Sequence, residues 1–229
     1  MIDANFRWQP TFAPLRLCVS SLCIVLLTGL ASARTITVTA EDCDQMACIS
    51  ANAPRLSWAM IQSGPGVFNA QPQFQWFSKQ ALLMRFPITE IVPKGQRITK
   101  AELTIHPTYM AGVAAHVQVR RVLAEWGTGV CHDYRMVHPQ KLEWAQPGGR
   151  GAGTDRHNKD SAVFKITKVG EYTADVTEDV ELWYTGANAN RGWIMTLGDG
   201  EVIYMTSPYT LPHIAGGKQW KLQITFEPQ

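Results

Sequence analysis

Residues 82–107, LLMRFPITEIVPKGQRITKAELTIHP, decide the fold class because they contain two β-strand patterns joined by a turn-forming stretch. The run 82–86 is almost continuously apolar and is followed at once by a proline. The run 101–106 alternates, so that its apolar residues share one face, as in a strand with one buried side. The segment therefore predicts two strands separated by a turn.

The same kind of pattern recurs along most of the chain. Short β-branched or apolar runs are separated by turns containing Gly, Pro, Asn or Asp, which is typical of sandwiches and barrels. Outside the opening stretch, these runs are 35–39, 117–122, 163–166, 192–197, 202–205 and 221–226. The chain has 229 residues, 45% of them hydrophobic, which is enough for one such domain with a substantial core. We predict a single all-β sandwich domain over residues 34–229.

One segment has the pattern of a helix instead. Asp175 can cap the first backbone amides, and an acidic residue follows three positions later, much as in a capping box. Val176, Val180 and Trp183 then recur at helical spacing before a glycine supplies the stop. We expect one short helix at residues 176–185, packed across an end of the sandwich, with its tryptophan in the core.

Residues 1–33 have the pattern of a secretory signal peptide. Two arginines precede an apolar stretch at 17–30, and Ala31-Ser32-Ala33 follows it, which predicts cleavage before Arg34. An uncleaved membrane anchor is the alternative, but the apolar stretch is shorter than the roughly 20 residues that span a bilayer. We expect an exported protein that is secreted, periplasmic or at the cell surface, with no membrane span after cleavage.

The charge balance argues against a nucleic-acid partner. The formal net charge is +2, and the lysines and arginines are scattered rather than gathered in a basic tail.

Three cysteines follow the leader, and an oxidising compartment would allow them to pair. A Cys43–Cys48 disulfide would close a short loop, and a Cys43–Cys131 disulfide is an equally allowed connectivity. A zinc site is disfavoured, because the Cys-His-Asp sequence at 131–133 belongs to no recognised ligand spacing.

Arg85 is a charged residue at the end of an apolar strand. A buried guanidinium needs an acidic partner, and Asp175 and Glu102 are the candidates. We expect a structural role for this arginine.

Three further stretches, in the order in which they occur, extend the pattern of the opening segment. They are VQVRRVLAEWGTGV at 117–130, GEYTADVTEDVELWYTGANANRGWIMTLG at 170–198 and a closing WKLQITFE. Together with 82–107 they resemble the DNRLRE-type domain family, which overlaps with carbohydrate-binding modules allied to alginate- and pectin-active enzymes. The resemblance covers residues 80–227. It implies a jelly-roll β-sandwich with a non-catalytic role.

Carbohydrate binding needs exposed aromatic faces with amide, carboxylate or arginine groups beside them. We expect such residues in loops, because aromatic residues on alternating strands usually point into the core. The long Gly- and His-rich region 127–160 is the foremost loop of this kind. The candidate ligand-binding residues are Tyr109, Tyr134, Arg135, Trp144 and Tyr209. They predict a polysaccharide or another cell-surface component as the ligand.

Asp155, Asn158 and Asp160 place oxygen donors on a Gly-rich loop. Secreted sandwiches often hold a structural calcium ion through such groups, so these three residues are candidate calcium ligands. Their spacing does not match an EF-hand.

Two other functions compete with glycan binding. Tyr134, Arg135 and His138 could abstract a proton beside a uronate carboxylate, as polysaccharide lyases do. The sequence contains no nucleophile elbow and no His-Glu-x-x-His motif, so binding is favoured over catalysis. A structural or adhesion protein of the cell envelope, with a protein partner, is the remaining alternative.

Overall fold

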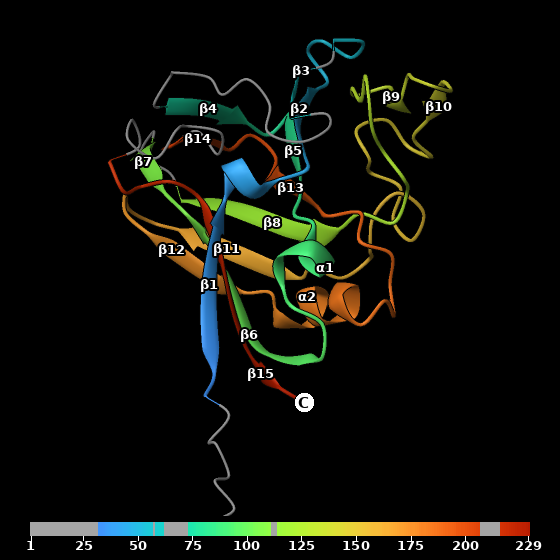
Figure 1. Ribbon diagram of the computed structural model, residues 1–229. Helices are drawn as coiled ribbons and strands as arrows, with labels where there is room; N and C mark the ends of the chain where they lie inside the picture. Colours follow the sequence, from blue (N-terminus) through green and yellow to red (C-terminus); the bar gives the residue numbers. More distant parts are fainter. Residues whose placement is uncertain (1–31, 57, 62–72, 111–113, 207–215) are drawn as a thin grey trace, which may run out of the picture. The chain divides into compact units, whose positions relative to one another are not determined.

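The computed structural model describes residues 32–56, 58–61, 73–110, 114–206 and 216–229. Two antiparallel sheets packed face to face form the main part of the fold (Figure 1). The first sheet contains, in spatial order, β1 (Arg34–Thr39), β15 (Lys221–Pro228), β6 (Gln96–Ile105) and β12 (Tyr172–Asp175). The second contains β11 (Ala162–Ile166), β8 (Ala115–Arg121), β13 (Trp193–Leu197), β5 (Gln80–Arg85), β2 (Gln45–Ser50) and β3 (Trp58–Ile61). The predicted leader lies almost entirely outside the described residues.

The strands are connected as in a jelly roll. The order β1-β15-β6-β12 in one sheet is matched by β5-β13-β8-β11 in the other, and β2 and β3 extend the second sheet beyond β5. The first and last strands of the sandwich are therefore neighbours, and β13 lies between β5 and β8, the arrangement of two Greek keys. The prediction of an all-β, jelly-roll sandwich is confirmed.

The main core lies between the two sheets, and its burial explains the hydrophobic patterns of residues 82–107. The alternating face of β6 is fully buried, with Ala101, Leu103 and Ile105 each 0% exposed. Neighbouring residues of β5 are buried on opposite sides, because Leu82 belongs to the main core and Leu83 to a second hydrophobic cluster. A strand covered on both faces has no polar side, and it therefore reads as a continuous apolar run.

The second cluster covers the outer face of the six-stranded sheet. It joins Leu83 and Ile194 of the sheet to Trp126, Val130 and Trp144 of the long segment between β8 and β11. This segment also contains the two-stranded pairing of β9 (Tyr134–Met136) with β10 (Leu142–Glu143). Much of the region that was expected to be a functional loop therefore packs against the outer face of the six-stranded sheet.

Two helices lie against each other at one end of the sandwich (Figure 1). Helix α2 (Thr177–Tyr184) confirms the expected helix, and the Asp175 carboxylate accepts a hydrogen bond from the Thr177 backbone amide at 2.8 Å. Helix α1 (Ile88–Ile91) is a single turn between two prolines that the sequence did not lead us to expect. A further 3₁₀ turn, η1 (Ala40–Asp42), follows β1. Within the described part of the chain, no helix has the length and apolar character needed to cross a membrane.

A buried polar network fixes α2 to the six-stranded sheet. Asp179 is 4% exposed, and its Oδ1 lies 3.0 Å from the Arg121 Nε. Its Oδ2 accepts a hydrogen bond from the Trp193 indole at 2.6 Å. Arg121 and Trp193 are register partners on β8 and β13, so one carboxylate bridges two strands and the helix. Burial raises the pKa of Asp179, although its Ser161 and Trp193 hydrogen bonds and the Arg121 charge oppose that rise.

Arg85 has a different partner from those expected. Its Nε lies 2.8 Å from an oxygen of Asp44, because Gln45 is the register partner of Arg85 and Asp44 immediately precedes it. Asp175 and Glu102 belong to the first sheet, whereas Arg85 ends a strand of the second. The structural role of Arg85 stands with this corrected partner.

The three cysteines in the described part of the chain are not paired. Cys43, Cys48 and Cys131 are all free and buried, so the structure contains neither predicted disulfide. Cys48 is the fourth residue of the extended strand β2, whereas Cys43 lies two residues before this strand begins. Burial raises the pKa of the Cys48 thiol to about 12, so the group stays protonated.

Candidate functional site

A third, smaller sheet presents aromatic side chains to solvent. It consists of β4 (Gln73–Phe77), β14 (Val202–Thr206) and β7 (Pro107–Met110), with β14 in the middle. Ile203 and Met205 are 0% exposed, so the intervening residues of β14 must point outward. The register places Gln75, Tyr204 and Tyr109 in one row across the three strands, and Phe77 opposite Val202 in the next row. These last five residues are called the aromatic face below.

The side chains of the aromatic face are accessible and uncharged. Tyr109 is 56% exposed and Phe77 is 36% exposed, while Gln75 is also exposed. The Tyr109 and Tyr204 rings meet edge to face, with centroids 5.3 Å apart and planes at 79°. The surface thus combines apolar ring area with two phenol hydroxyls and an amide, the groups that hold the apolar and hydroxylated parts of a sugar.

The structure separates the predicted ligand-binding residues into two places. Tyr109 is on the aromatic face, whereas Tyr134 and Arg135 are in β9 and Trp144 directly follows β10. The two groups belong to different sheets, and β7 and the β9-β10 pair are well separated in Figure 1. Tyr209 lies outside the described residues.

Trp144 is not available to stack on a sugar, and this prediction is corrected. The side chain is 5% exposed and belongs to the same hydrophobic cluster as Ile194. Its indole donates a hydrogen bond to the Cys131 carbonyl at 2.9 Å. The ring anchors the long segment to the outer face of the sheet, so its role is structural.

Tyr134 and Arg135 are held by contacts within their own loop. The Lys141 Nζ lies 4.1 Å from the centroid of the Tyr134 ring. Arg135 donates hydrogen bonds to the carbonyls of Glu125 at 2.6 Å and Glu143 at 3.2 Å. These bonds hold the guanidinium against the backbone of its own loop.

Both carboxylates among the three candidate calcium ligands are engaged by other groups. Asp155 is 2% exposed, and its two oxygens accept hydrogen bonds at 2.8–2.9 Å from the backbone amides of residues 145, 146 and 151. Asp160 forms an ion pair with Arg120 instead, and Asn158 is exposed. Among the described residues, no group of three or more His, Cys, Asp or Glu side chains is placed to hold a metal ion. Asp155 acts as an internal anchor for the loop.

Replacing Asp155 by alanine should lower the free energy of unfolding by about 3 kcal/mol, because three backbone amides lose a charged acceptor. Urea unfolding measures the loss, and faster amide exchange at residues 145, 146 and 151 locates it. Asp199→Ala, at an exposed turn, is the matched control and should change stability by less than about 0.5 kcal/mol. Equal effects of the two substitutions would contradict the anchoring role.

The sequence pattern did not identify Tyr204, Phe77 and Gln75 as candidate binding residues. Aromatic residues in strands were expected in the core, yet the run 202–205 is apolar on both faces and only its alternate residues are buried. Successive side chains of a strand point to opposite faces, so position alone places Tyr204 on the face of the strand away from Ile203 and Met205.

No family model matches the chain, and no curated protein matches its sequence. The resemblance to DNRLRE-type domains stays a prediction.

Proposed function

We propose that this protein is an exported, non-catalytic carbohydrate-binding module that holds its glycan on the aromatic face. The observation that carries the proposal is the solvent-facing row of Gln75, Tyr204 and Tyr109, with exposed Phe77 beside it.

The chemistry of this row suits a sugar. Aromatic rings pack against the C–H surface of a pyranose, and Tyr and Gln polar groups hydrogen-bond its hydroxyls. The residues stand on paired strands, so little side-chain and backbone freedom is lost when the glycan binds. The aromatic face contains no charged residue, which favours a neutral glycan over a polyuronate.

Tyr109→Ala and Tyr204→Ala should each weaken glycan retention about 10-fold, since each removes one stacking ring worth roughly 1–1.5 kcal/mol. Affinity electrophoresis through gels containing neutral β-glucan, xylan or mannan, with alginate as the acidic comparison, measures retention. Tyr134→Ala is the matched control, because it removes a tyrosine from the other predicted site, and it should leave retention unchanged. Unfolding midpoints of the three variants exclude a loss of folding.

Two results would overturn this proposal. Retention by a neutral glycan that survives both Tyr109→Ala and Tyr204→Ala would remove the aromatic face from the binding site. Absence of retention on every neutral and acidic glycan would favour the structural or adhesion function, with a protein as the partner.

A further inference from the structure

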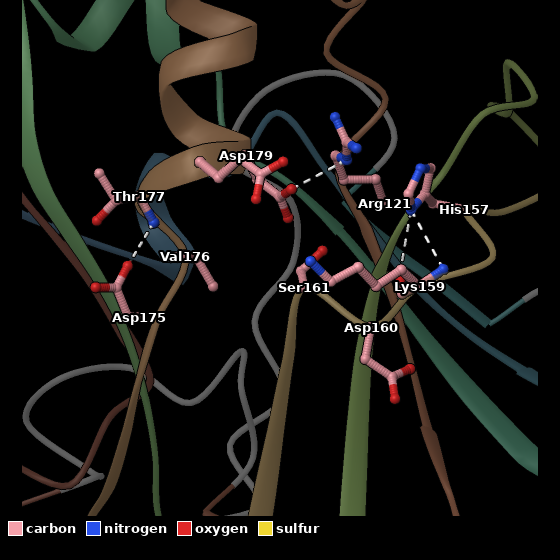
Figure 2. Close-up of a pocket in the computed structure, with 10 residues that line it drawn as sticks. Arg121, His157, Lys159, Asp160, Ser161, Asp175, Val176, Thr177 and Asp179 are labelled. Atoms are coloured by element: carbon pink, nitrogen blue, oxygen red, sulfur yellow. Dashed lines mark hydrogen bonds and ion pairs between the residues drawn. The ribbon is translucent and has the colours of Figure 1, made fainter.

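A pocket of about 250 Å³ lies between the start of α2 and the segment that leads into β11 (Figure 2). We call it the α2 pocket. Six of its lining residues matter here: Arg121, Lys159, Ser161, Asp175, Glu178 and Asp179. None of them belongs to the aromatic face, so the two sites can be tested separately.

The floor of the α2 pocket is the buried ion pair between Arg121 and Asp179. Their side chains are 11% and 5% exposed. Arg121 reaches the carboxylate through Nε and is one of the lining residues, and its guanidinium carries further N–H donors on its two terminal nitrogens. A planar guanidinium is suited to a carboxylate or a similar anion.

The side of the pocket formed by the segment before β11 adds a cation. Lys159 extends toward the middle of the pocket in Figure 2, beside Ser161, whose side chain hydrogen-bonds to Asp179. Asp160 points away in the same view, and its charge is already matched by Arg120. An anionic group on this side therefore meets Arg121 and Lys159.

The opposite side, at the junction of β12 and α2, offers acceptors. The Asp175 Oδ1 accepts the Thr177 amide, and hydrogen bonds from the side chain and the backbone of Thr177 lower the pKa of Asp175, which keeps this exposed carboxylate ionised. Glu178 is exposed on the first turn of α2. Hydroxyl or ammonium groups of a ligand would bond to these two carboxylates.

We infer that the α2 pocket binds a small organic acid that carries hydrogen-bond donors at its other end. Its anionic group lies against Arg121 and Lys159, and its hydroxyl or ammonium groups face Asp175 and Glu178. The volume lies below the range of about 300–1,000 Å³ found for drug-sized ligands, so the ligand is about one ring in size. A sugar acid and an amino acid both have this chemistry.

The test is a titration of the purified protein with four probes, namely D-glucuronate, L-threonine, D-glucose and sulfate. The readout is the Trp193 indole N–H resonance, which reports the floor because this group donates to Asp179. Trp193→Phe assigns the resonance. At least one of glucuronate and threonine should bind about 10-fold more tightly than glucose and sulfate, because only these two probes engage both sides of the pocket.

Charge-removing substitutions on exposed residues complete the test without disturbing the buried floor. Lys159→Gln and Glu178→Gln should each weaken the preferred acid about 3- to 10-fold. Lys165→Gln, on an exposed position of β11 that does not line the pocket, is the matched control and should have no effect. Any of three results would overturn the inference: no binding of either acid, equal binding of glucose or sulfate, or an affinity that Lys159→Gln leaves unchanged.

Discussion

Replacing Gly192 by alanine should stop the chain from folding, or lower its free energy of unfolding by at least about 4 kcal/mol. Gly192 has a φ of +73°, a conformation that residues with a Cβ rarely adopt. An added Cβ would also lie 2.1 Å from the carbonyl oxygen and 2.8 Å from the carbonyl carbon of Met84. Met84 is in β5, between β13 and β2, so its backbone cannot move away without breaking ladder hydrogen bonds.

The matched control is Gly186→Ala. Gly186 has nearly the same φ, +75°, but an added Cβ would meet nothing within 4 Å. This variant should lose only about 1–2 kcal/mol, the cost of the left-handed conformation. Chemical unfolding of the two variants therefore separates the backbone overlap from the conformational cost. Equal losses of unfolding free energy in the two variants would mean that Gly192 does not pack against the Met84 backbone of β5.

The parts of the fold that the sequence predicts well are those in which side-chain periodicity has only one reading. The alternation of 101–106 identified the buried face of β6, and the helical spacing of Val180 and Trp183 identified α2. Helix α1 was missed because a single turn is too short to show a period. The Arg85 partner was missed because the register of β2 against β5 depends on contacts between strands that the sequence pattern does not specify.

The candidate site was harder to predict, because alternation tells which residues share a face but not what covers that face. Trp144 occurs in a region rich in glycine and proline and was expected to be exposed. That region covers the six-stranded sheet, and Trp144 is buried between the two. Tyr204 occurs in a strand and was expected to be buried, yet it points to solvent from a small three-stranded sheet. Both errors concern the covering of a sheet by distant segments, which is a property of tertiary structure.

Asp179→Ala should lower the free energy of unfolding by about 3–5 kcal/mol, because it leaves Arg121 buried without its counter-charge and the Trp193 indole without an acceptor. Asp179→Asn should cost less, since an amide oxygen can still accept one of these bonds. Urea unfolding with far-ultraviolet circular dichroism measures both. Glu181→Ala, which removes an exposed carboxylate from the same helix, is the control and should stay within about 0.5 kcal/mol of the unchanged protein.

The pH dependence of the difference in free energy of unfolding between the unchanged protein and Asp179→Asn tests whether burial or ion pairing governs the pKa of Asp179. Because burial raises its pKa in the folded protein above the ordinary value of 3.8, the unfolded chain ionises first as the pH rises. The folded state then loses stability between pH 3.8 and the raised pKa, and the stabilisation is complete only below that window. Asp179→Asn has no group to titrate there, so the advantage of the unchanged protein over this variant should shrink as the pH rises through the window. An advantage that grows instead would mean that attraction to Arg121 outweighs the cost of burial, and that α2 is held to the sheet mainly by charge.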